Sequence, residues 1–126
     1  MVDRPLALII EDEIGLAMMY ERVLSSMGYR VLKATNGDTA LELLQDNTPV
    51  FIMSDMRLPG TNANVIIDYI ASEPRFDHTF VLVVSSGREY EMSIAPLKNA
   101  RFMVKPILLN QIMEIAEPVC RTREAG

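Results

Sequence analysis

The stretch Leu6-Ala7-Leu8-Ile9-Ile10-Glu11-Asp12 decides the fold. A run of apolar residues that ends abruptly in acidic ones is typical of a strand buried on both faces of a sheet. Apolar residues then recur at three- and four-residue steps over residues 16–27, and Gly28 follows where a helix would end. A buried strand followed by an amphipathic helix is the repeating unit of parallel sheets with helices on both faces. The sequence therefore predicts an α/β fold.

The same alternation continues along the rest of the chain. Short apolar runs predict further strands at residues 29–34, 50–53, 80–84 and 101–104. Helical spacing of apolar residues predicts further helices at 38–48, 65–73 and 108–115. Asp38 can cap the first of these helices, and Pro96 makes a helix within residues 88–97 irregular. We predict a doubly wound, five-stranded parallel sheet with about five helices, of which the fourth is irregular.

Length and composition describe one packed domain. The chain has 126 residues, of which 49% are hydrophobic and 23% charged, close to the average for globular domains. We predict a single domain over residues 1–126, with a tail at 118–126. The apolar runs are too short to cross a bilayer and no basic and apolar leader opens the chain, so we expect a cytoplasmic location without membrane insertion.

Charge and cysteine content argue against two classes of site. The formal net charge is −5 and the basic residues are scattered, so direct binding to nucleic acid is not expected. Cys120 is the only cysteine, which excludes an internal disulfide and a multi-cysteine zinc site. We interpret it as a packing or surface thiol.

Polar residues collect where the predicted strands end. Parallel strands end at the same edge of a sheet, and ligands of doubly wound folds bind outside that edge. Carboxylates, hydroxyls and one ammonium group follow the first, third, fourth and fifth strands: Glu11, Asp12, Asp55, Ser85, Ser86 and Lys105. We expect these groups to form one site.

This set of groups suits phosphoryl transfer beside a hard cation. Carboxylates held together repel one another, and a bound cation relieves that repulsion. Mg²⁺ accepts oxygen ligands and keeps several waters, which leaves room for phosphate oxygens. Asp55 can be the nucleophile toward phosphorus. Lys105 would then contact one phosphoryl oxygen, and Ser85 would donate a hydrogen bond to another.

Each of these residues also has a purely structural interpretation. Glu11 and Asp12 could cap the first helix, because negative charge is favoured at a helix N-terminus. Asp55 could be a turn residue before Pro59-Gly60, and Lys105 could be an ordinary surface lysine. The two serines could be loop residues. The functional interpretation therefore depends on the joint occurrence of these groups at one edge.

Four ordered motifs resemble the receiver domain of bacterial response regulators. They are Leu8-Ile9-Ile10-Glu11-Asp12-Glu13, Ser54-Asp55-Met56-Arg57-Leu58-Pro59-Gly60, Val83-Val84-Ser85-Ser86 and Phe102-Met103-Val104-Lys105-Pro106. The resemblance covers about residues 5–117, which would be the domain core. It implies a flavodoxin-like sheet with strand order 2-1-3-4-5.

The resemblance implies a role for each site residue. Asp55 would accept a phosphoryl group from a histidine kinase or a histidine phosphotransfer protein, as one step of a two-component phosphorelay. Asp12, Asp55 and the backbone carbonyl of Arg57 would ligate Mg²⁺, and Glu11 would act through a water. Lys105 would contact the phosphoryl group, and its bond to the following proline would be cis.

The resemblance also implies a switch that carries the signal to a downstream protein partner. Ser85 would move toward the phosphoryl group while Phe102 turns inward. The chain departs from the family along this route. Ser85 stands where threonine is more usual, Ser86 could share or take over its role, and residues 86–100 are slightly short and contain Pro96.

Two other functions remain open at this point. A pseudo-receiver would keep the fold as a protein-binding module without phosphorylation, which the altered region after Ser85 suggests. A small phosphohydrolase could use the same aspartyl-phosphate, although Arg57 stands where a second acidic residue would be expected. A stand-alone receiver and a domain of a larger regulator or kinase would share all these features.

Overall fold

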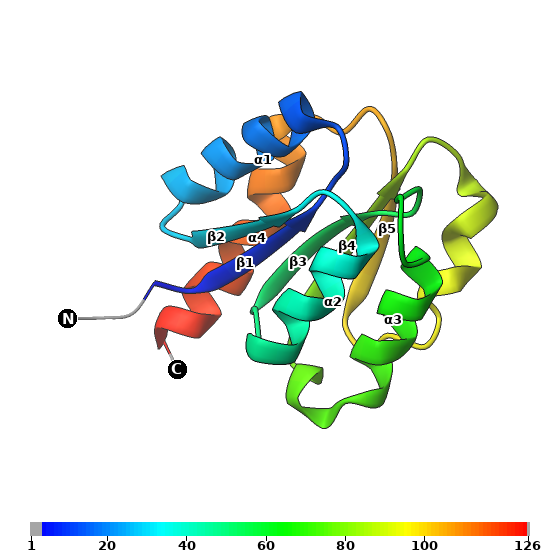
Figure 1. The fold of residues 1–126 in the computed structure, drawn as a ribbon. Coiled ribbons are helices and arrows are strands. Elements are labelled where there is room, and N and C mark those ends of the chain that lie inside the picture. Colours follow the sequence, from blue (N-terminus) through cyan, green and yellow to red (C-terminus); the bar gives the residue numbers. More distant parts are fainter. Residues whose placement is uncertain (1–3, 126) are drawn as a thin grey trace.

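A five-stranded parallel sheet forms the centre of the computed structural model, which describes residues 4–125 (Figure 1). The strand order is β2-β1-β3-β4-β5, as predicted. The strands are β1 Leu6–Ile10, β2 Arg30–Ala34, β3 Phe51–Asp55, β4 Phe80–Ser85 and β5 Ala100–Val104. Because all strands run in one direction, their carboxyl ends meet at one edge of the sheet.

Helices cover both faces of the sheet, as the buried, continuously apolar strands require. On one face lie α1 (Ile14–Ser26) and α4 (Leu109–Ala125), and on the other lie α2 (Gly37–Asp46) and α3 (Ala63–Ser72) (Figure 1). Two separate apolar cores result. Tyr20 and Ile112 belong to the core under α1 and α4, whereas Leu44 and Ile66 belong to the core under α2 and α3.

The start of α2 corrects one prediction, because the helix begins at Gly37 and is capped by Asn36 and not by Asp38. The Asn36 side chain accepts a hydrogen bond from the backbone N–H of Thr39 at 2.8 Å, which is the usual bond of a helix N-cap. Asp38 lies inside the first turn, and its carboxylate accepts hydrogen bonds from the backbone N–H and the hydroxyl of Thr61. Asp38 therefore ties α2 to the loop after β3.

The segment between β4 and β5 is irregular, as predicted. It forms a 3-10 helix, η2 (Arg88–Ile94), in which no residue is buried. A second 3-10 helix, η1 (Pro74–Phe76), precedes β4. Its Phe76 is buried, so the two segments differ in how firmly they attach to the core.

The last helix continues beyond the expected end of the core. The tail predicted at residues 118–126 is helical as far as Ala125, although Pro118 lies inside the helix. Ala116 and Cys120 flank this proline and are both buried, which explains why packing carries the helix past it. Cys120 is therefore a packing thiol. Among the helices at residues 4–125, none is both long and apolar enough to span a membrane.

Candidate functional site

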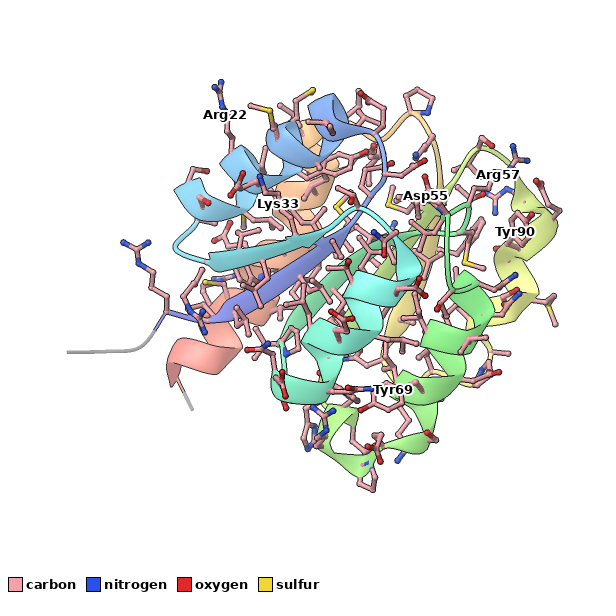
Figure 2. The ribbon with its side chains drawn as sticks, in the orientation of Figure 1. Arg22, Lys33, Asp55, Arg57, Tyr69 and Tyr90 are labelled. Atoms are coloured by element: carbon pink, nitrogen blue, oxygen red, sulfur yellow. The ribbon has the colours of Figure 1, made fainter. Side chains whose placement is uncertain are left out.

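Three side chains from three strand ends meet at the carboxyl edge of the sheet. Asp55 is the last residue of β3, Glu11 directly follows β1, and Lys105 directly follows β5. The Lys105 Nζ lies 2.7 Å from Asp55 Oδ2 and 3.1 Å from Glu11 Oε1. Figure 2 shows Asp55 at this edge, between the sheet and η2. The predicted convergence of these residues is confirmed.

Burial strengthens the interactions among the charges of Glu11, Asp55 and Lys105. Glu11 is 2% exposed and Asp55 is 7% exposed, and charges this deep persist only when they are paired. Burial raises the pKa of Glu11 above its ordinary value, although Lys105 and a backbone N–H of Glu13 oppose the shift. Burial alone would lower the pKa of Lys105, but its hydrogen bonds to Asp55 and Glu11 outweigh burial and raise that pKa. Lys105 therefore stays positively charged between the two carboxyl groups.

The acidic residues also fit a hard cation. One oxygen each from Glu11, Asp12 and Asp55 lie within 4.8 Å of one another. Asp12 is exposed, so it reaches this cluster from the solvent side. Carboxylate oxygens with an open solvent side match the preference of Mg²⁺ for a few oxygen ligands and several waters. The structural alternative for Glu11 and Asp12 does not hold, because Glu13 caps α1.

The loop after β3 orients the Asp55 carboxylate. The backbone N–H of Arg57 donates a hydrogen bond of 3.0 Å to Asp55 Oδ1, while Oδ2 accepts the bond from Lys105. Each carboxylate oxygen of Asp55 thus has one donor. The bond between Lys105 and Pro106 is cis, as the resemblance implies.

The two candidate switch hydroxyls lie in different environments. Ser85 is fully buried at the end of β4, and its hydroxyl has no hydrogen-bond partner within the described chain. Ser86 is exposed. Phe102 already points inward, where it packs into the core under α2 and α3. A buried hydroxyl without a hydrogen-bond partner lowers the stability of the fold. The Ser85 hydroxyl is therefore a donor available to an acceptor that binds at the carboxyl edge of the sheet.

Two features of the site were missed from the sequence. The Arg57 guanidinium pairs with Glu89 of η2 at 3.0 Å. In addition, the loop after β3 packs directly against α2. A Cβ on Gly37 would lie 1.9 Å from the Thr61 carbonyl oxygen, so only glycine allows this approach. Both features join segments that are distant in sequence, and neither leaves a local pattern.

Comparisons with known proteins agree with this geometry. The family model of the response regulator receiver domain matches residues 7–117. Regulator of RpoS from Escherichia coli strain K12 is 33% identical over 108 residues, which are 86% of this chain and 31% of that protein. The chain thus spans less than a third of that relative's length.

Solved structures share the fold at low sequence identity. The chemotaxis response regulator CheY4 of Vibrio cholerae superposes with a TM-score of 0.81 at 21% identity, over 93% of this chain and 99% of that one. The receiver domain of the sensor histidine kinase PA1611 from Pseudomonas aeruginosa gives a TM-score of 0.80 at 18% identity, over 94% and 99%. That structure is described with a magnesium ion coordinated in its active site cleft.

Proposed function

This chain belongs to the response regulator receiver family, whose members are signalling modules of two-component systems, and from that premise we propose that Asp55 is its phosphoacceptor. The observation that carries this proposal is the partly buried contact of 2.7 Å between Asp55 and Lys105 at the carboxyl edge of the sheet. A carboxylate beside a fixed ammonium group and an open acidic cluster can attack phosphorus while the new charge is neutralised.

The phosphoryl group would come from a phosphohistidine. An oxygen of Asp55 attacks the phosphorus, an O–P bond forms and the P–N bond breaks. The departing imidazole keeps the electron pair and takes up a proton from solvent. Lys105 would contact the phosphoryl oxygens once they are bound to Asp55, because its Nζ already lies 2.7 Å from Asp55 Oδ2.

A magnesium ion would be held by Asp12, Asp55 and the backbone carbonyl of Arg57, with Glu11 acting through a water. The ion would neutralise charge on the phosphoryl oxygens during transfer. The closeness of the three carboxylates supports this assignment. Among the described residues, Lys105 is the one positive charge that contacts this cluster. One positive charge does not balance three carboxylates, so the site keeps a net negative charge that a cation could neutralise.

Ser85 and Phe102 would form the switch that reports the modification. The unpartnered Ser85 hydroxyl supports this role, because a phosphoryl oxygen would give it the acceptor that it lacks in the described chain. Lys105 donates its backbone N–H to the Ser85 carbonyl at 2.7 Å, so movement at Ser85 reaches the end of β5. Phe102 lies on β5 and is already buried, so it would respond by a change in packing and not by turning inward.

Exposed apolar residues beside the site support a protein as the phosphodonor. Ile14 is 67% exposed at the start of α1, and Leu108 is 59% exposed just before α4. These helices contact each other, and both begin near the carboxyl edge of the sheet (Figure 1). An apolar surface around the phosphoacceptor suits docking of a histidine kinase or a histidine phosphotransfer protein. A downstream protein partner would then read the modified state.

Intact-mass measurement after incubation with Mg²⁺ and acetyl phosphate tests the proposal. We expect wild type to gain one phosphoryl mass and Asp55→Asn to gain none. Asp68→Asn is the matched control, because this exposed carboxylate lies on α3 outside the site and its loss should leave uptake unchanged. Wild type that folds and binds Mg²⁺ but takes up no phosphoryl group would instead be a pseudo-receiver. Continuous turnover of the donor at a high rate would indicate a phosphohydrolase.

A further inference from the structure

Arg57 joins the phosphoacceptor loop to η2. Its backbone N–H donates to Asp55 Oδ1 at 3.0 Å, and its guanidinium lies 3.0 Å from Glu89 Oε1. Figure 2 shows Asp55, Arg57 and, on η2, Tyr90 at the same end of the molecule. The pKa of Arg57 is raised, first by the hydrogen bond with Glu89 and then by the nearby Tyr90. One residue thus contacts both the modified group and the adjacent segment.

The Arg57 and Glu89 pair is easily exchanged. The two side chains are 62% and 51% exposed, and ion pairs in water contribute little to stability. A phosphoryl group carries more charge than a carboxylate and has three acceptor oxygens, and arginine binds it with two parallel hydrogen bonds. A phosphoryl group on Asp55 would therefore be a stronger partner for Arg57 than Glu89 is.

The position of Glu89 depends on the absence of a side chain at residue 87. A Cβ on Gly87 would lie 2.2 Å from Glu89 Oε2, so the Glu89 carboxylate folds back over this glycine. Gly87 has a φ of −155°, an extended conformation that any residue adopts. An added methyl group would therefore displace Glu89 without straining the backbone.

The other contacts of η2, with β4, β5 and α3, are made by side chains that are at most partly buried. The helix contains no buried residue, and the pair between Arg88 and Glu91 is internal to the segment. Tyr90 and Ile94 are partly buried against the core under α2 and α3. Loss of the bond to Arg57 would therefore loosen η2 and uncover the apolar side chains beneath it.

We propose that Arg57 is a further phosphoryl-binding residue, and that its guanidinium leaves Glu89 for the phosphoryl oxygens when Asp55 is modified. The exchange releases η2 and so turns a charge added at Asp55 into a changed surface for a protein partner. The inference rests on the proposed phosphorylation of Asp55. It adds a route for the signal that is separate from Ser85 and Phe102.

Amide hydrogen exchange tests the release of η2. It is measured with and without BeF₃⁻, a phosphoryl mimic that is added together with Mg²⁺. In wild type, amides of residues 88–97 should exchange roughly two- to five-fold faster in the bound state, the effect expected when one exposed ion pair is lost. Glu89→Gln and Gly87→Ala should exchange at the faster rate already without BeF₃⁻. Glu91→Gln is the matched control, because it breaks an exposed pair within η2 and should keep the response to BeF₃⁻.

Substitution of Arg57 and substitution of Glu89 should change the affinity of the protein for BeF₃⁻ in opposite directions. If binding of BeF₃⁻ breaks the pair, breaking the pair beforehand must strengthen binding by the same factor. Glu89→Gln and Gly87→Ala should thus bind roughly two- to five-fold tighter, and Arg57→Gln should bind more weakly. If Arg57→Gln and Glu89→Gln bound BeF₃⁻ with equal affinity, the proposed move of Arg57 from Glu89 to the phosphoryl group would be wrong. Phosphorylation of Asp55 would still stand if wild type gains a phosphoryl mass. Wild type that gains no phosphoryl mass would overturn the proposed function itself.

Discussion

The two ends of β4 are built from similar parts but are held differently. At its amino end, the buried Thr79 hydroxyl donates to the Pro49 carbonyl at 2.6 Å, and η1 inserts Phe76 into the core. At its carboxyl end, the buried Ser85 hydroxyl has no partner in the described chain, and η2 packs on the core only through partly buried side chains such as Tyr90 and Ile94. Each end therefore has a buried hydroxyl and a 3-10 helix, but only the amino end is fully bonded.

Arg75 accounts for much of this difference. Its guanidinium donates to the Leu44 and Asn47 carbonyls and to the Tyr69 hydroxyl, and it lies 4.1 Å from the centre of the Phe76 ring. Arg57 at the other end has one exposed carboxylate partner, Glu89. The side-chain hydrogen bonds that fix a 3-10 helix are concentrated at the amino end, and the proposed chemistry occurs at the end whose 3-10 helix has fewer of them. Such a division is expected when a surface must change on modification.

Removal of Arg75 should have the largest effect. Arg75→Ala is expected to lower the free energy of unfolding by about 2 kcal/mol, because several charged hydrogen bonds and the contact with Phe76 are lost together. Urea denaturation measures the change. Binding of BeF₃⁻ should stay unaltered, since Arg75 lies at the opposite end of the sheet.

Arg88→Ala is the matched control, since the described structure gives its side chain one ion-pair partner, the exposed Glu91 within η2. It should lower the free energy of unfolding by less than about 1 kcal/mol, the usual range for an exposed ion pair. Similar losses in the two variants would mean that η1 and η2 are held equally firmly.

Amide exchange in unmodified wild type should show a smaller difference between the same segments. The N–H groups of Phe76, Asp77 and Thr79 bond at 3.0 Å within a segment anchored in the core. Those of Ala95 and Leu97 bond within or beside η2, which opens without exposing a buried residue of its own. We expect these amides at residues 76–79 to exchange roughly tenfold more slowly than those at residues 95 and 97. Comparable protection would show that η2 is held by contacts other than those described.

The sheet and the centre of the site could be predicted because their cause is local. Apolar runs define the strands, and the residue after each run must lie at the carboxyl edge of a parallel sheet. Glu11, Asp55 and Lys105 were therefore found from their positions alone. The irregular η2 also followed from a local signal, the proline at residue 96.

The parts that could not be predicted depend on contacts between distant segments. Asp38 looked like a helix cap because it follows a glycine, but Asn36 takes that role and Asp38 bonds to Thr61 instead. No local pattern marks Arg75, and only the fold brings the Leu44 carbonyl and Tyr69 to it. Long polar side chains have many possible partners, so spacing in the sequence does not identify the one that they meet.

A further predicted difference concerns the two hydroxyls at the ends of β4. Thr79→Val removes the donor to the Pro49 carbonyl and should lower the free energy of unfolding by about 1–2 kcal/mol. Ser85→Ala removes a hydroxyl that has no partner in the described chain, so stability should stay the same or rise by up to about 1 kcal/mol. Phosphoryl uptake should follow the reverse order, with Ser85→Ala slower and Thr79→Val normal. If Ser85→Ala were instead as destabilising as Thr79→Val, the Ser85 hydroxyl would be bonded in the unmodified protein, and its freedom to turn toward a phosphoryl group would be lost.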